Sequence, residues 1–264
     1  MNTSYHFSGA GNDFVVIDGR EGDVSEYREV PRIEALCKEH KTDGLMILGS
    51  GDAEVDFTME FYNPDGSGGM MCGNGGRCIV AFADYLGIEP ASGDVFLFRA
   101  PDGLHTGEIL VRPEDCLWTV RIKMIDVQGI TPMLGGWFLN TGTRHFVKFV
   151  DDVEQVDIDT EGKALRWNEA FAPVGTNVNF VHIAPDGLHV RTFEKGVEGE
   201  TLACGTGLTA CALVAHHAGI PTATPGAYRL RARQDWLSVN FTPGADEKFT
   251  DVYLTGPARL LEIL

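Results

Sequence analysis

Short apolar segments separated by turn residues predict that the chain consists mainly of β-strands. The segment 31–40 begins with proline and has apolar residues at 33, 36 and 37, which is the spacing of a short amphipathic helix. Apolar runs bounded by glycine, proline and asparagine predict strands instead. In the first half these strands lie within 5–18, where a glycine turn separates two of them, and at 45–48, 55–62, 94–99, 104–111 and 117–122.

The second half of the chain repeats this scheme. An amphipathic piece is expected at 153–167. Strands are expected within 137–150 and at 176–182, 188–194, 228–233, 237–241 and 250–254.

Two further apolar stretches have helical character, and each follows a cysteine-glycine motif. Residues 71–78 read Met-Cys-Gly-Asn-Gly-Gly-Arg-Cys, and residues 203–208 read Ala-Cys-Gly-Thr-Gly-Leu. Cys72 and Cys204 are therefore expected at helix N-termini. There the unpaired backbone N–H groups and the positive end of the helix dipole favour an anion, which lowers a thiol pKa from about 8.5 towards neutrality and also forms a cradle for a carboxylate.

The two cysteines are 132 positions apart, half the length of the 264-residue chain, which indicates an internal duplication. The same offset aligns Phe61 with Phe193, and an offset of 131 aligns Gly11 with Gly142. A period this long predicts two homologous lobes rather than a solenoid. A pseudo-dyad would bring the two helix ends face to face, with the active site between the lobes. The lobes are expected at 1–126 and 127–255, with 256–264 packing back onto the first.

Composition narrows the class of protein. The 21 basic and 38 acidic residues give a net charge of −17, which argues against nucleic acid and anionic membranes as partners. The first residues lack the regions of a signal peptide, and no segment approaches 18 consecutive apolar residues, so a cytoplasmic protein is expected. Six cysteines in such a chain are expected to be free thiols. Those expected to be ordinary buried core residues are Cys37, Cys78, Cys116 and Cys211.

Other chemistries fit these motifs poorly. The two cysteines of each motif are six or seven positions apart, wider than the spacing with which two sulfurs bind one zinc ion, so no metal is expected. Residues 162–163 are followed by alanine, which excludes a P-loop, and residues 9–14 lack the third glycine of a dinucleotide fingerprint. A cysteine-protease triad would leave the second thiol unexplained.

Two thiols on one ligand are what inversion at a carbon requires in the absence of a cofactor. One thiolate removes the α-proton from one face, and the opposite thiol delivers a proton to the other face. The N–H groups at the helix ends would hold the α-carboxylate and take up the negative charge that develops on it. A racemase or epimerase that needs no cofactor and acts on a small amino acid is therefore the predicted function.

The motifs resemble those of the diaminopimelate epimerase family, within the larger group of cofactor-independent amino-acid racemases. The most specific match is Asn-x-Asp-Gly-Ser at 63–67 followed by the motif at 71–78, and the resemblance covers most of the chain. It implies interconversion of LL- and meso-2,6-diaminopimelate in lysine and peptidoglycan synthesis. It also implies an α+β fold of two pseudo-symmetric lobes, each a curved mixed β-sheet wrapped around a central helix. Supporting matches lie at 9–14, 177, 193–194 and 203–207.

The resemblance implies roles for individual residues. Cys72 and Cys204 would be the base and the acid, and Glu194 would bind the α-ammonium group. His145 would stand near the thiols as a supporting group. The backbone N–H groups offered to the reacting carboxylate would be those of Gly73, Asn74, Gly205 and Thr206. The distal end of the substrate would be held by Asn12, Asn63, Asn177 and Lys195.

The chain departs from the family pattern at positions that concern the distal end. Gly44 stands where many members have glutamine, Thr143 and Arg144 stand where Asn-Pro is common, and Lys195 puts a point charge in place of a forked guanidinium.

A proline or hydroxyproline racemase-like enzyme is one alternative function, since the second cysteine motif alone would permit it. A catalytically silent binding protein of the same fold is another, although retention of both thiols argues against it. A homodimer is compatible with the resemblance.

Overall fold

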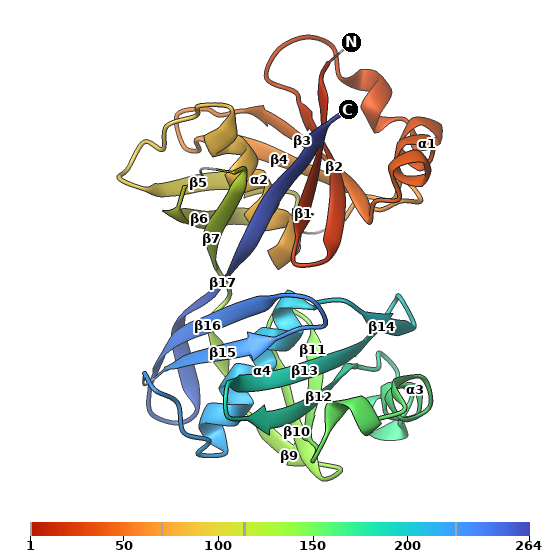
Figure 1. Cartoon of the computed structure of the whole chain (residues 1–264), viewed down its shortest axis with the longest axis vertical. Helices are drawn as coiled ribbons and strands as arrows, with labels where there is room; N and C mark the ends of the chain where they lie inside the picture. Colours follow the sequence, from red (N-terminus) through yellow and green to blue (C-terminus); the bar gives the residue numbers. More distant parts are fainter. Residues whose placement is uncertain (1, 70, 113–114, 225) are drawn as a thin grey trace. The chain divides into compact units, whose positions relative to one another are not determined.

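The chain folds as two compact units. One is formed by residues 1–122 and 256–264, and the other by residues 123–255. Each unit is a mixed β-sheet that surrounds one helix (Figure 1). The computed structural model describes residues 2–69, 71–112, 115–224 and 226–264.

The first unit is built from strands β1 (Ser4–Gly9), β2 (Asn12–Asp18), β3 (Gly44–Ser50), β4 (Phe57–Tyr62), β5 (Val95–Ala100), β6 (Gly103–Val111) and β7 (Leu117–Lys123). Consecutive strands are neighbours, and the pairs β2–β3 and β4–β5 are parallel while the others are antiparallel. The second half of β17 (Lys248–Ile263) pairs with both β7 and β1. The C-terminus thereby closes this sheet around helix α2 (Gly73–Tyr85).

The second unit is built from β8 (Val127–Gln128), β9 (Thr131–Met133), β10 (Gly136–Asn140), β11 (Arg144–Phe149), β12 (Asn177–Ala184), β13 (Gly187–Glu194), β14 (Gly199–Thr201), β15 (Ala227–Arg231), β16 (Trp236–Pro243) and the first half of β17. The pairs β11–β12 and β13–β15 are parallel, as are their counterparts in the first unit. Helix α4 (Gly205–His217) is the helix of this unit. The sequence pattern did not predict β8, β9 or β14, because two or three residues are too short for alternation to be visible.

The two units repeat one scheme of elements. Helices α2 and α4 have the same length, and their first residues lie 132 positions apart. In α2 every residue from 73 to 83 is buried, and in α4 most residues are buried as well. Each helix is therefore the apolar centre of its own unit. The expected α+β architecture, with a mixed sheet wrapped around a central helix, is confirmed.

Helix α1 (Val30–His40) covers the outer face of the first sheet. Its buried side chains, Ile33, Leu36 and Cys37, pack against apolar residues of β2 and β3. Because α2 lies on one face of these strands and α1 on the other, β2 and β3 are apolar along most of their length instead of alternating. The helix predicted at 31–40 is confirmed.

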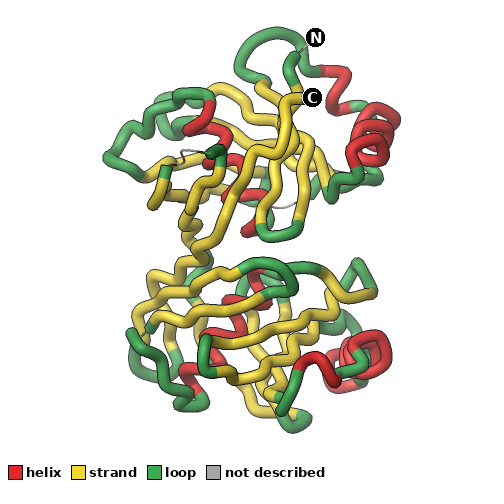
Figure 2. Tube along the Cα trace, viewed as in Figure 1, coloured by secondary structure: helices red, strands yellow, loops and turns green. Residues whose placement is uncertain are grey.

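The amphipathic piece expected at 153–167 is not one helix. It consists of η2 (Val153–Gln155), the π-helical turn η3 (Ile158–Gly162) and the short helix α3 (Lys163–Arg166), and η4 (Glu169–Phe171) follows. Asp152 and Asp157 each accept a hydrogen bond from a backbone N–H two or three residues later. These caps start separate turns, which breaks the segment into short helices (Figure 2).

The boundary between the units lies slightly earlier than the sequence places it. The predicted boundary is at 126/127, whereas the structure divides the chain at 122/123. The N–H of Met124 donates to the carbonyl of Val252 at 2.8 Å, so the chain joins the second sheet directly after β7. Within the described residues, no helix is long and apolar enough to cross a membrane.

The six cysteines, all within the described part of the chain, are free thiols as expected. Cys37, Cys78 and Cys211 are buried, which confirms their prediction as core residues. The same prediction is wrong for Cys116, which is exposed. It precedes β7 with a left-handed backbone, φ 59°, so it belongs to a turn rather than to the core.

Candidate active site

Cys72 is the N-cap residue of α2. Its backbone is extended (φ −101°, ψ 150°), and its Sγ accepts a hydrogen bond from the N–H of Gly75 at 3.2 Å. A Cβ at position 75 would lie 3.2 Å from that sulfur, so glycine lets the thiol lie directly against the helix end. The residue is only partly buried. Cys72 is therefore a hydrogen-bonded thiol at the positive end of a buried helix.

Cys204 is the N-cap residue of α4. It is 9% exposed, and its Sγ lies 3.5 Å from the hydroxyl of Thr206. A Cβ at position 207 would lie 3.3 Å from the sulfur, so Gly207 plays the same part as the glycine in the first motif. Burial and then the charge of Glu194 raise the pKa of the Cys204 thiol. The prediction of a cysteine at each helix N-terminus is confirmed. The expected lowering of the thiol pKa is wrong for Cys204, because burial and the charge of Glu194 outweigh the helix dipole and favour the neutral thiol.

Glu194 is the last residue of strand β13 and acts on this thiol, and Lys195 follows it in the chain. A carboxylate oxygen of Glu194 accepts a hydrogen bond from the hydroxyl of Thr201 on β14. The backbone N–H of Lys195 donates to the side-chain oxygen of Asn177 at 2.8 Å, while the lysine side chain is exposed. Asn177 also donates to the carbonyl of Arg144 at 2.9 Å. The amide of Asn177 thus ties the end of β13 to the start of β11.

His145 lies at the centre of a hydrogen-bond network behind Thr206. The imidazole is fully buried, and burial lowers its pKa from 6.5 to about 3, so it is neutral. Its Nε2 lies 2.9 Å from the hydroxyls of both Thr143 and Thr206. Its Nδ1 lies 3.1 Å from the side-chain nitrogen of Asn179. The predicted supporting residue therefore contacts Thr206, which in turn contacts the sulfur of Cys204.

In the first unit, Asn12 and Asn74 are joined directly. The amide nitrogen of Asn74 donates to the amide oxygen of Asn12 at 2.6 Å. Asn74 is the second residue of α2 and is buried, whereas Asn12 begins β2 and is partly exposed. The structure thus places one predicted distal-end residue beside the first thiol helix.

Asn63 lies in a loop whose polar side chains bond to one another. Its amide donates to the hydroxyl of Ser67 at 3.0 Å, and that hydroxyl donates to Asp65 at 2.6 Å. The N–H of Ser67 also donates to the same carboxylate, and these bonds hold the pKa of Asp65 below its usual value. The loop therefore has a defined shape of its own.

Two departures from the family pattern are packed into the structure. A Cβ at Gly44 would lie 2.7 Å from the carbonyl of Tyr62 and 3.0 Å from the ring of Phe61, so the position has no room for a larger residue. The guanidinium of Arg144 lies over the ring of Phe138 at 5.1 Å and donates to the carbonyl of Phe171. Both positions therefore serve packing within their own units.

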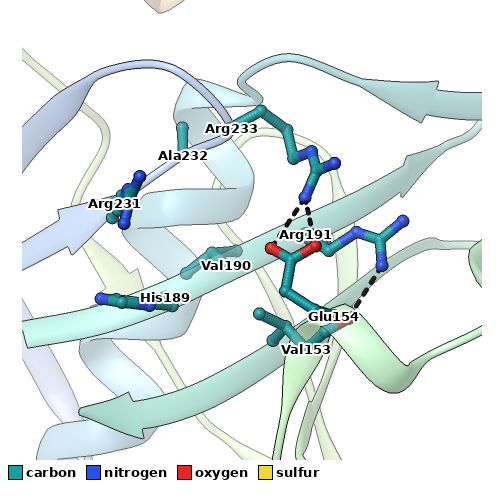
Figure 3. Close-up of a pocket in the computed structure, with 8 residues that line it drawn as sticks. All are labelled: Val153, Glu154, His189, Val190, Arg191, Arg231, Ala232 and Arg233. Carbon is teal, nitrogen blue, oxygen red and sulfur yellow. Dashed lines mark hydrogen bonds and ion pairs between the residues drawn. The ribbon is translucent and has the colours of Figure 1, made fainter.

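A separate pocket on the second unit contains none of the predicted site residues (Figure 3). Arg191 and Arg233 line it, and their guanidinium groups are paired with Glu200 and Glu154 respectively. These pairs neutralise much of its positive charge. Across the described ranges, no group of three or more His, Cys, Asp or Glu side chains is arranged to hold a metal ion.

Comparison with known proteins decides the family. The model of the family described as diaminopimelate epimerase matches residues 5–104 and 137–261. The chain belongs to the diaminopimelate epimerase family. The enzyme of that name from Chlorobaculum tepidum is 42% identical over 96% of each chain, and that from Flavobacterium psychrophilum is 36% identical over 97% of each. The relative from Aquifex aeolicus is 38% identical over 96% of this chain and 93% of its own.

Solved structures share the fold of this member of the diaminopimelate epimerase family at low identity. A phenazine biosynthesis protein from Bacillus anthracis has a TM-score of 0.78 at 11% identity and covers 100% of this chain and 98% of its own. A probable proline racemase from Agrobacterium radiobacter has a TM-score of 0.67 at 14% identity, with coverage of 100% and 92%. These similarities show the fold alone.

Several residues of the site were missed by the sequence analysis. Asn179, Thr143 and Arg77 hold predicted residues in place, yet the sequence analysis gave none of them a role, although Arg77 stands within the first cysteine motif. The sequence feature that could have revealed them is a polar residue within an apolar strand or helix. Asn179 is an amide inside the apolar strand β12, and Arg77 is a cation inside the apolar helix α2.

Proposed function

We propose that this chain interconverts LL- and meso-2,6-diaminopimelate with Cys72 and Cys204 as its two acid-base groups and without a cofactor. The observation that carries the proposal is the placement of one cysteine at the N-terminus of each of two equivalent helices in a member of this family. Curated relatives that match nearly the whole chain are named diaminopimelate epimerase. The chain is an isomerase that acts on a small molecule, and we assign it to the cytoplasm, where lysine and peptidoglycan precursors are made.

The proposed reaction needs one thiolate and one thiol. The thiolate takes the α-proton, so the Cα–H bond breaks and an S–H bond forms. The other thiol then gives its proton to the opposite face of the carbon. Burial and Glu194 raise the pKa of Cys204, which favours its thiol form. We therefore assign Cys72 as the base and Cys204 as the proton donor in one direction of the reaction, and the two thiols exchange these roles in the reverse direction.

The helix ends supply the groups that would stabilise the intermediate. When the α-proton leaves, negative charge spreads from the carbon into the α-carboxylate. Backbone N–H groups in the first turn of a helix are not used within the helix and can donate to that carboxylate. In this proposal they come from Gly73, Asn74, Gly205 and Thr206.

Recognition of the substrate is assigned to charges and amides around the thiols. Glu194 would accept the α-ammonium group, because its carboxylate acts directly on Cys204. The exposed ammonium of Lys195, with Asn12 and Asn63, would bind the distal end. The side-chain amide of Asn177 is hydrogen-bonded to the backbones of Arg144 and Lys195, so we assign Asn177 a positioning role for Lys195.

The deciding experiment is turnover of LL-diaminopimelate in D2O without added pyridoxal phosphate or metal. We expect solvent deuterium at one α-carbon of the meso product, observed by NMR or mass spectrometry. Product without label, or activity that a chelator abolishes and a metal restores, would contradict the two-thiol mechanism. Efficient racemisation of proline or 4-hydroxyproline with no turnover of diaminopimelate would instead support the proline racemase alternative.

A further inference from the structure

A chain of side-chain hydrogen bonds runs from the centre of the first unit to its surface. The guanidinium of Arg77 donates to the amide oxygen of Asn74 at 2.8 Å. The amide nitrogen of Asn74 donates to the oxygen of Asn12 at 2.6 Å, and the nitrogen of Asn12 donates to the carboxylate of Asp43 at 3.2 Å. Four side chains from three parts of the sequence thus form one connected chain.

The two ends of this chain fix its direction. A guanidinium can only donate hydrogen bonds, and an ionised carboxylate can only accept them. Arg77 therefore requires the oxygen of Asn74 at its end, and Asp43 requires the nitrogen of Asn12 at the other end. Each amide would lose a hydrogen bond if it turned over, so the orientation of both is set from both sides.

Both ends are themselves anchored. Arg77 is fully buried, and it also donates to the carbonyls of Gly73 and Pro257, both at 3.2 Å. Asp43 accepts from the N–H of Asp13 at 2.9 Å, and its own N–H donates to the carbonyl of Asp13 at 2.7 Å. This row of hydrogen-bonded side chains is therefore held by helix α2 at one end and by the start of β2 at the other.

The second unit holds the equivalent helix position in another way. The counterpart of Asn74, 132 positions later, is Thr206, which is held by His145. The counterpart of Arg77 is Thr209, whose hydroxyl donates to the carbonyl of Gly205 at 3.0 Å. The row of hydrogen bonds that ends in two charged side chains is thus a feature of the first unit, and the repeated fold does not require it.

We propose that Arg77 and Asp43 are positioning residues that hold the amides of Asn74 and Asn12 in one orientation. The amide nitrogen of Asn12 carries two N–H groups, and one is used on Asp43. Because hydrogen-bonded neighbours hold the amide in one orientation, its second N–H has a fixed direction, and since Asn12 is partly exposed we assign this N–H to an acceptor outside the protein. The acceptor would be a carboxylate of the substrate, which rests on the function proposed above.

The first test is steady-state kinetics of Asp43→Asn in the full chain. An amide at position 43 can donate as well as accept, so it no longer requires a nitrogen from Asn12. We expect KM for diaminopimelate to rise about fivefold or more with a smaller change in kcat, since binding is affected more than the reacting centre. Asp94→Asn removes an exposed carboxylate of the same unit and should leave both constants unchanged.

The second test measures the amide without any substrate. In the wild-type protein one Nδ2 proton of Asn12, the one bonded to Asp43, should exchange with solvent more slowly than the other. In Asp43→Asn this difference should be lost, and in Asp94→Asn it should remain. The two NMR signals of the Asn12 side-chain amide are assigned by their absence from the spectrum of Asn12→Ser.

The outcomes separate this inference from the proposed function. If the wild-type protein fails to turn over diaminopimelate, the proposed function is wrong, and the exchange experiment still decides whether Asp43 orients Asn12. Equal exchange of both Asn12 protons in the wild type would overturn the inference. A lower melting temperature of Asp43→Asn with unchanged KM would also overturn it, because the role would then be structural only.

Discussion

The amide nitrogen of Asn179 donates to Nδ1 of His145 at 3.1 Å, and this bond determines which nitrogen of the imidazole carries the proton. The same amide donates to the carbonyl of Phe146 at 3.0 Å, while its oxygen accepts from the hydroxyl of Thr192 at 3.0 Å. Asn179 is therefore fixed with its nitrogen towards His145. Since Nδ1 accepts, the neutral ring carries its proton on Nε2, which can donate to Thr143 or Thr206.

The first prediction concerns the stability of the folded protein in acid. Burial lowers the pKa of His145 from 6.5 to about 3, so between these values the unfolded chain binds a proton that the folded chain does not. The free energy of unfolding should therefore be unaffected by His145 above pH 6.5 and should fall as the pH drops from 6.5 towards 3. This one residue should contribute up to about 1.4 kcal/mol to the fall for each pH unit.

This contribution can be isolated by urea unfolding at several pH values. His145→Gln keeps a side-chain donor and removes the titration, so the loss of stability below pH 6.5 should become shallower. An identical slope in wild type and His145→Gln would show that His145 does not titrate in this window.

The second prediction concerns the two thiols at the helix ends. Cys72→Ala and Cys204→Ala should each abolish epimerisation, because inversion requires an acid-base group on both faces of the carbon. Turnover is measured by conversion of LL-diaminopimelate to the meso form.

The matched controls are the buried thiols one or two turns further along each helix. Cys78→Ala and Cys211→Ala should retain turnover and lower the free energy of unfolding by about 1–2 kcal/mol, as small truncations in a packed core do. A Cys78→Ala protein that folds normally but has no activity would mean that the wrong thiol has been assigned.

The third prediction tests the distal end of the substrate. The exposed ammonium of Lys195 can pair with a distal carboxylate but lacks the planar fork of arginine. For Lys195→Met we expect kcat/KM on diaminopimelate to fall at least about tenfold, which corresponds to roughly 1.4 kcal/mol of transition-state stabilisation. Lys38→Met, an exposed lysine of α1, should have no effect. Unchanged diaminopimelate turnover in Lys195→Met would remove this residue from the site.

The fourth prediction concerns the departure at Gly44. A Cβ there would lie 2.7 Å from the carbonyl of Tyr62, which is backbone and cannot move aside easily. Gly44→Ala should therefore lower the free energy of unfolding by about 1–3 kcal/mol, the usual range for overpacking. Gly199→Ala, where a Cβ would meet nothing within 4 Å, should be much milder. Equal stability of the two variants would show that the strand can adjust at position 44.

The sequence by itself determined the longer strands, helices α1, α2 and α4, and the placement of the two thiols at helix ends. Strand alternation, the proline at the start of α1 and the glycines after Cys72 and Cys204 are local features, and local backbone and capping preferences suffice to interpret them. The 132-residue offset indicated the duplication, because equivalent helices keep equivalent positions in each repeat.

Only the tertiary structure decided how the polar side chains are paired. The carbonyl of Pro257 accepts a hydrogen bond from Arg77. Asn12 is hydrogen-bonded to Asp43 and Asn74, although these residues are far from it in the sequence. The proton position on His145 likewise depends on Asn179 in a different strand. A side-chain hydrogen bond depends on distances of a few tenths of an ångström, and these are set by packing and by the closing of the sheet by β17, which no local pattern in the sequence specifies.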